Sequence, residues 1–226
     1  MKAKTKNISI VLYKPKYAGN VGSVARAAKN MGIRNIVVVG ETGLDREEME
    51  RRSTHLAADV LDQIRYCDAI EEALGGFHYI VGTTARLGKA RGPFVSPRAE
   101  ALKIAGLSQK NQIALLFGPE DTGLANEQLR LCHSVVTIPT SREFSSLNLS
   151  QAAMILCYET DSYTHLRAHE TVLELVCRLL LEKKKNSTSG KPPQLQTRSK
   201  PYKPRNNTYT HTSIQHIYLQ QYQTQT

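Results

Sequence analysis

Short apolar runs alternate with polar, helix-forming stretches from Asn7 to about Tyr158. The apolar runs are continuous instead of alternating in polarity, which is typical of strands that are covered on both faces of a sheet. This arrangement predicts an α/β domain with a mostly parallel sheet. The strands predicted in this way are ISIVL (8–12), NIVVV (35–39), YIVG (79–82), IALLF (113–117) and VVTIP (135–139).

Helical spacing fills several gaps between these strands. We expect a helix that begins at an Asn20 cap and ends at Gly32, and further helical segments over 53–64 and 68–74. The segment LNLSQAAMILCY (147–158) is apolar around most of its circumference, so it should pack in the core or at a subunit interface.

The composition changes abruptly after residue 185. Residues 186–226 are rich in Asn, Gln, Thr, Ser and Pro and offer little apolar surface to offset the entropy lost on ordering. We therefore predict an α/β domain over 1–165, an amphipathic helix within 166–185 and a disordered, basic tail over 186–226. A tail that contacts RNA through its charge and its tyrosines is the alternative.

Charge and cysteine content narrow the class of protein. The 226 residues carry a net charge of +10, half of it in the tail, so the body is itself basic, which is compatible with a nucleic acid partner. No apolar window approaches a membrane span and the N-terminal residues show no secretory signal, so we expect a cytoplasmic protein without a membrane partner. The cysteines are far apart without a C-x-x-C pair, which predicts reduced structural thiols and no metal: Cys67, Cys132, Cys157 and Cys177.

One segment imitates a nucleotide-binding motif. GTTARLGK (82–89) has the spacing of a phosphate-binding P-loop and follows a predicted strand. The next residue is Ala90, where magnesium binding needs Ser or Thr, and Arg91-Gly92-Pro93 interrupts the helix that should cradle the phosphates. A P-loop ATPase is therefore a weak alternative, and it predicts ATP binding that is lost in Lys89→Ala.

Three polar segments stand directly after a predicted strand or at the start of a helix, where open α/β sheets build their sites. Each also has a purely structural explanation: a helix cap with a surface arginine, a Gly and Pro turn that carries Glu120, and a cap for the next helix from Ser146 or Asn148. The segments are GNVGSVAR (19–26), LFGPEDTGL (116–124) and IPTSREFSSLNLS (138–150).

Together, in this order and spacing, the segments resemble the motifs N-x-G-x-x-A-R, F-G-x-E-x-x-G-L and I-P-x-x-x-x-x-S-L-N-x-S of the SpoU/TrmH branch of the SPOUT RNA 2′-O-ribose methyltransferases. NISIVLYKPKYAGNVGSVARAAKNMG and VGTTARLGKARGP resemble in particular the TrmJ-type tRNA methyltransferases. The resemblance implies a mostly parallel sheet with a C-terminal trefoil knot, a homodimer and S-adenosylmethionine as methyl donor. The implied substrate is the ribose of a tRNA cytidine or uridine at position 32, the first nucleotide of the anticodon loop.

The resemblance also implies roles for individual residues. Asn20 and Arg26 would approach the ribose and phosphate, with Glu120, Ser146 and Asn148 completing the reaction centre. The methyl donor would be held, largely through backbone groups, by Thr83, Thr84, Ala85, Gly118, Ile138, Ser145, Ser146 and Leu147.

The implied reaction is displacement of a sulfonium by a ribose 2′-hydroxyl, which needs no metal and is helped most by holding the oxygen about 3 Å from the methyl group. Removal of the hydroxyl proton is assigned by resemblance to Arg26. A guanidinium has a pKa above about 12 and is a poor base, so two roles stay open: a base made neutral by its site, or a cation that binds the adjacent phosphate.

The chain departs from the TrmJ-type pattern after the α/β domain, where one helix and a Gln/Thr-rich tail take the place of a linker and helical extension. The parts that select the RNA are those that do not match, so ribosomal RNA is an alternative substrate. A catalytically inactive RNA-binding module is an alternative function. The presence of all five reaction-centre residues favours the enzyme.

Overall fold

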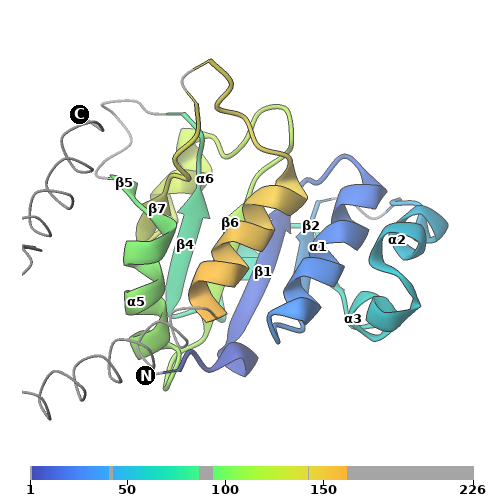
Figure 1. Cartoon of the computed structure of the whole chain (residues 1–226), viewed down its shortest axis with the longest axis horizontal. Coiled ribbons are helices and arrows are strands. Elements are labelled where there is room, and N and C mark those ends of the chain that lie inside the picture. The colour runs from blue at the N-terminus through green and yellow to red at the C-terminus, as the bar shows by residue number, and fades with distance from the viewer. Residues whose placement is uncertain (1, 41–42, 87–93, 142, 162–226) are drawn as a thin grey trace, which may run out of the picture. The chain divides into compact units, whose positions relative to one another are not determined.

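Seven parallel strands form the centre of the computed structural model, which describes residues 2–40, 43–86, 94–141 and 143–161 (Figure 1). Their order is β3-β2-β1-β6-β4-β7-β5, and every neighbouring pair is parallel. This confirms the predicted α/β class, and all five predicted strands are present. The strands are β1 (Ile8–Tyr13), β2 (Asn35–Val39), β3 (Arg65–Cys67), β4 (Tyr79–Thr83), β5 (Phe94–Val95), β6 (Ile113–Phe117) and β7 (Ser134–Val136).

The two strands that the sequence did not predict, β3 and β5, are the two edges of the sheet. They span three and two residues, and only Cys67 among them is buried. An edge strand pairs on one side only and stays partly exposed, so it needs no continuous apolar run. The periodicity that identified the central strands is therefore missing at the edges.

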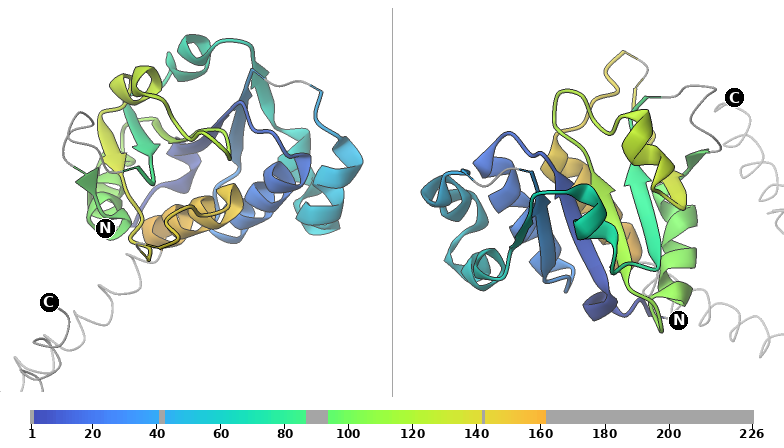
Figure 2. Two further views of the ribbon diagram at one scale, coloured as in Figure 1. Left: turned by 90° about the horizontal axis from the view of Figure 1, so that it is seen from above. Right: turned by 180° about the vertical axis from the view of Figure 1, so that it is seen from behind.

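Helices cover both faces of the sheet (Figures 1 and 2). On one face, α1, α5 and the helical residues 149–161 pack on alternate strand residues such as Ile10 and Leu115. On the other face, α4 and α6 pack on the residues between them, such as Val11 and Leu116. The helices are α1 (Ala18–Asn30), α2 (Arg46–Ser53), α3 (Ala58–Asp62), α4 (Ile70–Leu74), α5 (Pro97–Leu107) and α6 (Asn126–Arg130), with one-turn 3-10 helices at η1 (Thr5–Asn7) and η2 (His55–Ala57).

Two helix predictions need correction. Helix α1 starts at Ala18 with Tyr17 as its N-cap, so Asn20 lies inside the first turn and is not the cap, while the end before Gly32 is as predicted, with a φ of +71° there. The segment 53–64 is not one helix: α2 ends at Ser53, Thr54 takes a φ of +66°, and η2 and α3 follow. The charged helix α2 was missed because Met49 is its one buried apolar side chain.

All described residues belong to one compact unit, Met1–Leu179, and the predicted helix in 166–185 and tail over 186–226 lie outside them. Cys67 and Cys157 are buried and unpaired. Burial raises the pKa of Cys132 and of Cys157 to about 12, which suits structural thiols. Within the described ranges, no cluster of three His, Cys, Asp or Glu side chains could hold a metal ion, and no helix has the length and apolarity to cross a membrane.

Candidate active site

The candidate site lies at the carboxyl ends of the strands, where the direction of the sheet reverses. From β1 the chain builds β2 and β3 on one side, then crosses to β4 on the other, and β6 later fills the space between β1 and β4. Ligands of open α/β sheets bind in the crevice at such a switch point. Because all strands are parallel, the segments after β1, β4, β6 and β7 meet at this edge.

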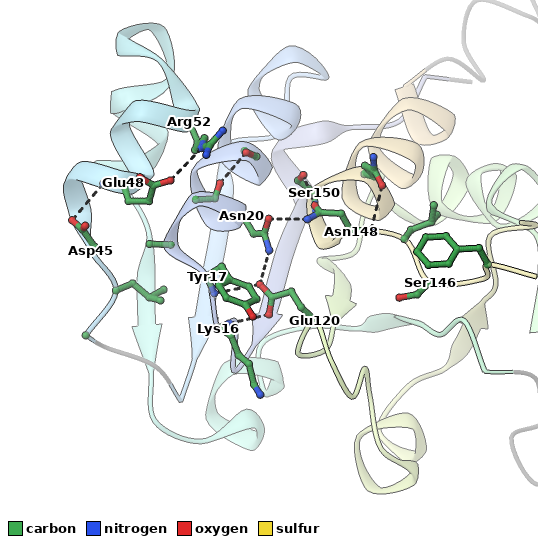
Figure 3. Close-up of a pocket in the computed structure, with 18 residues that line it drawn as sticks. Lys16, Tyr17, Asn20, Asp45, Glu48, Arg52, Glu120, Ser146, Asn148 and Ser150 are labelled. Atoms are coloured by element: carbon green, nitrogen blue, oxygen red, sulfur yellow. Dashed lines mark hydrogen bonds and ion pairs between the residues drawn. The ribbon is translucent and has the colours of Figure 1, made fainter.

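Two adjoining cavities open at this edge and share a wall formed by Glu120, Ser146 and Leu147. We call them the larger and the smaller cavity, with volumes of about 1230 and 260 Å³. The larger cavity (Figure 3) is lined by Lys16, Tyr17, Ala18, Gly19, Asn20, Ser23, Gly43, Leu44, Asp45, Glu48, Arg52, Glu120, Phe144, Ser146, Leu147, Asn148, Ser150 and Gln151. The smaller cavity is lined by Thr83, Thr84, Ala85, Arg86, Phe117, Gly118, Pro119, Glu120, Asp121, Thr122, Gly123, Val136, Ile138, Ser145, Ser146, Leu147, Leu149 and Ala152.

A carboxylate organises the larger cavity (Figure 3). The backbone N–H of Lys16 donates to Glu120 Oε2 at 2.9 Å, and that of Tyr17 donates to Oε1 at 3.4 Å. Asn20 Nδ2 also donates to Oε1, at 2.8 Å. Glu120 thus places a negative charge at the N-terminus of α1, where backbone N–H groups lack partners and the helix dipole favours an anion.

The network continues from Asn20 to the third motif. Asn148 Nδ2 donates to Asn20 Oδ1 at 3.0 Å, which joins segments that are far apart in the sequence. Asn148 also caps the helix of residues 149–161, because its Oδ1 accepts from the Ser150 N–H at 2.8 Å while its own N–H donates to Gln151 Oε1 at 3.2 Å. The structural explanation of Asn148 is therefore confirmed, and the same side chain lines the larger cavity.

Two motif glycines have a packing reason that the sequence does not reveal. A Cβ on Gly22 would lie 2.1 Å from the backbone oxygen of Met49, because α1 and α2 approach each other closely there. A Cβ on Gly118 would lie 2.4 Å from the backbone of Gly123 and Leu124, where the turn after β6 folds back on itself. These glycines allow the backbone approaches that bring the site segments together.

The ends of three strands are fastened around the smaller cavity. The Thr84 N–H donates to the Val136 carbonyl at 3.0 Å, and Thr137 Oγ1 donates to the Thr84 carbonyl at 3.0 Å. Thr83 Oγ1 donates to the Leu116 carbonyl at 3.2 Å. The structure brings together in this one cavity all eight residues named for the methyl donor: Thr83, Thr84, Ala85, Gly118, Ile138, Ser145, Ser146 and Leu147.

Four of the five named reaction-centre residues, Asn20, Glu120, Ser146 and Asn148, line the larger cavity, and Arg26 does not. Arg26 is exposed on α1 and lines a groove of about 670 Å³ that adjoins the larger cavity, because the two share Ser23, Leu147, Ser150 and Gln151. That groove runs between α1 and the helix of residues 149–161 and includes Met154 and Ile155. Within this chain, therefore, Arg26 lines the groove beside the cavity that the other four residues line.

Charged residues that sequence reasoning missed also surround the larger cavity. Lys16 Nζ pairs with Asp121 at 2.5 Å, and this hydrogen bond raises the pKa of Lys16 and lowers that of Asp121. Arg52 pairs with Glu48 at 3.1 Å and thereby lowers the pKa of Glu48. Lys16 stands three residues after the end of β1, so its place after a strand was the signal that could have revealed it.

Comparison with known proteins finds relatives of this chain. The model of the SpoU rRNA Methylase family matches residues 7–158. A tRNA (cytidine/uridine-2′-O-)-methyltransferase TrmJ of Yersinia pestis (strain Pestoides F) is 39% identical over 153 residues, which are 68% of this chain and 59% of the relative. The tRNA (cytidine-2′-O-)-methyltransferase TrmJ of Methanocaldococcus jannaschii is 36% identical over 156 residues, 67% of this chain and 66% of the relative.

The fold is likewise similar to solved structures. A probable methylase family protein from Haemophilus influenzae Rd KW20 aligns with a TM-score of 0.67 and 33% identity, over 74% of this chain and 70% of that protein. The chain spans about three-fifths of the length of the Yersinia relative that it matches.

Proposed function

The chain belongs to the SpoU rRNA methylase family, and from this premise we propose that it is an S-adenosylmethionine-dependent RNA 2′-O-ribose methyltransferase that acts on tRNA. The observation that carries the proposal is the pair of adjoining cavities. One is lined by the residues implied for the methyl donor, the other by four residues implied for the reaction, and Glu120 and Ser146 stand in the wall between them.

The smaller cavity suits S-adenosylmethionine. Apolar side chains, among them Phe117, Ile138 and Leu149, offer a surface for an adenine ring, and the backbone turns at Thr84 and Gly118 offer polar groups. When bound there, the donor would supply a methyl group already activated on a sulfonium sulfur. The residues that would hold it are the eight that line this cavity, from the end of β4 and the segment after it, from the segment after β6 and from the loop that follows β7.

In the larger cavity, the role of Glu120 is to hold other side chains in position. Its oxygens accept three hydrogen bonds, and through Asn20 it fixes the side chain of Asn148. A ribose in the cavity would therefore meet amide and hydroxyl groups whose rotamers are locked by neighbours. Such preorganisation is the main help that a displacement at an activated methyl group needs.

We also propose that the protein works as a homodimer through the groove between α1 and the helix of residues 149–161. Met154 and Ile155 are half-exposed there, and an apolar helix face left open to water is typical of an interface. Arg26 lines the same groove, so dimerisation would place it at the interface, as a neutral base or as a phosphate anchor. Sedimentation showing a monomer at micromolar concentration would contradict this proposal.

The substrate proposal is a tRNA cytidine or uridine at position 32, supported by the names of the matched relatives and by the motif resemblance. The C-terminal trefoil knot is part of the same proposal, supported by the resemblance and by the insertion of β6 and β7 between earlier strands. Ribosomal RNA is the second candidate, which the description of the matching family favours.

The experiment is transfer of a labelled methyl group from S-adenosylmethionine to unmodified tRNA and ribosomal RNA transcripts, with the product nucleotide mapped by mass spectrometry. We expect a 2′-O-methylated pyrimidine in the anticodon loop. Arg26→Ala should abolish transfer, and an Arg26→Lys variant that stays largely active would favour the phosphate anchor over the neutral base. Binding of RNA without transfer to any transcript would favour the inactive binding module.

A further inference from the structure

Two exposed aromatic side chains line the larger cavity. Tyr17 is 62% exposed and Phe144 is 78% exposed. Tyr17 precedes α1, and Phe144 belongs to the loop that leads into the helix of residues 149–161, so the two rings come from opposite ends of the described chain. The other large hydrophobic side chains that the described residues expose, such as Leu56 and Tyr66, do not line this cavity.

The described lining of the cavity holds two cations, Lys16 and Arg52, and three carboxylates, so its net charge does not favour a phosphate. Lys16 is paired with Asp121, and Arg52 is paired with Glu48. Asp45 is occupied as the N-cap of α2, where it accepts from two backbone N–H groups. A nucleotide would therefore present its neutral part, base and ribose, to this cavity, and its phosphates would stay outside.

Each aromatic residue is tied to a residue of the wall between the cavities. The backbone N–H of Tyr17 donates to Glu120, the carboxylate that also holds Asn20 (Figure 3). Phe144 stands two residues before Ser146, which lines both cavities. Both aromatic residues thus line the same cavity as the polar groups that would receive the ribose.

We propose that Tyr17 and Phe144 stack the base of the nucleotide that is methylated, after it has left the base stack of the RNA. The inference rests on the proposed function, because it assigns the base of the same nucleotide whose ribose faces Asn20 and Ser146. Every base has a π face, so recognition by stacking tolerates different bases. Selection of the site would then depend on RNA shape more than on base identity.

The first test replaces the rings by leucine. Tyr17→Leu and Phe144→Leu should each lower kcat/KM for a tRNA transcript by about 5- to 150-fold, the range of one lost base stack. Tyr17→Phe and Phe144→Tyr should retain most activity, because they keep a ring. Tyr66→Leu, which changes an exposed tyrosine on edge strand β3 outside the cavity, is the matched control and should not change kcat/KM.

Two further measurements, of the melting temperature and of the affinity for S-adenosylmethionine, distinguish a loss of stacking from damage to the fold. Because both side chains are mostly exposed, the leucine variants should keep the wild-type melting temperature and the wild-type affinity for S-adenosylmethionine. Variants that lose either property would reveal a structural role and contradict the inference. A Tyr17→Leu, Phe144→Leu double variant with wild-type kcat/KM would also overturn it.

The second test needs no catalysis. An RNA that carries 4-thiouridine at the nucleotide methylated by the wild-type protein is cross-linked by light, and the tryptic peptides are identified. If no transfer occurs, the thiouridine is placed at position 32 of an anticodon stem-loop. We expect cross-links in the peptide Tyr17–Arg26 and in the peptide that begins at Glu143. Cross-links confined to other peptides would refute the stacking site. An inactive wild-type protein with these cross-links would refute the proposed activity alone.

Discussion

Two glutamates hold segments of this fold together in opposite surroundings. Glu100, in α5, is 3% exposed and accepts hydrogen bonds from Tyr79 Oη at 2.7 Å and Ser134 Oγ at 2.9 Å. Glu120, after β6, is half-buried in the wall between the two cavities and accepts from Asn20 and two backbone N–H groups. Glu100 joins α5 to two strands and Glu120 joins the turn after β6 to the start of α1, but only Glu120 does so beside open space.

The difference lies in what surrounds the donors. The donors to Glu100 belong to β4 and β7, beneath α5, and Glu100 lines neither cavity. Asn20, a donor to Glu120, lines the larger cavity and continues the network to Asn148. A satisfied buried carboxylate therefore serves the fold, whereas the same group at a cavity wall keeps other side chains in position for a ligand.

The largest effect on stability is expected for Glu100→Ala, which tests whether Glu100 serves the fold alone. Two donors, the buried Tyr79 and the half-buried Ser134, would lose their acceptor and the side chain would leave a void, so we expect a loss of about 3 kcal/mol in the free energy of unfolding. Methyl transfer at a temperature where the variant is folded should change little. Urea unfolding followed by circular dichroism measures the first effect, and an undiminished stability would show that Glu100 does not hold β4 and β7 together.

Glu120→Gln should show the opposite pattern. One amide oxygen remains to accept, but the amide nitrogen cannot replace the second oxygen, so Asn20 or the N-terminus of α1 loses its partner. We expect a free energy of unfolding within about 1 kcal/mol of wild type and a fall in kcat of about 100-fold. Urea unfolding and a single-turnover transfer assay on the same sample measure the effects on stability and on kcat separately. Equal activity of variant and wild type would contradict a role of Glu120 in the site.

The Glu100 cluster should also be sensitive to alkali. Burial raises the pKa of Tyr79. The hydrogen bond between Lys103 and Tyr79 raises the pKa of Lys103. A group whose pKa is raised in the folded state contributes stability below its ordinary pKa, near 10 for tyrosine, and loses that contribution as the pH rises through the raised value. The melting temperature of the wild type should therefore fall more steeply above pH 10 than that of Tyr79→Phe. The exposed-tyrosine control, Tyr66→Phe, should follow the wild type.

The smallest effect is expected at the Lys16 and Asp121 pair near Glu120. Both side chains are about half exposed, at 51% and 50%, so solvent screens the attraction. The pKa of Asp121 is lowered by Lys16, and the stability from the pair is present above the ordinary Asp pKa and is lost as the pH falls through the lowered value. Asp121→Asn should shift the melting temperature only slightly at neutral pH and not at all in strong acid. A large shift at neutral pH would contradict a weak, solvent-screened ion pair.

The sequence predicted the central strands because β1, β2, β4 and β6 are buried on both faces and therefore read as continuous apolar runs. It did not predict β3 and β5, which are short, partly exposed edges. The motif resemblance named eight residues for the methyl donor, and the structure shows that they line one cavity. The hydrogen bonds from backbone N–H groups to Glu120 could not be foreseen, because backbone donors are the same at every residue but proline.

The division of work between the cavities is tested most directly by calorimetric titration of S-adenosylmethionine into two tryptophan variants. Ala85→Trp places a large ring in the smaller cavity at an exposed position, and Ala125→Trp, also exposed, is the control outside both cavities. We predict binding to the wild type and to Ala125→Trp, no binding to Ala85→Trp and no binding of ATP to any of them. Undiminished binding to a folded Ala85→Trp would contradict the assignment of the methyl donor to the smaller cavity.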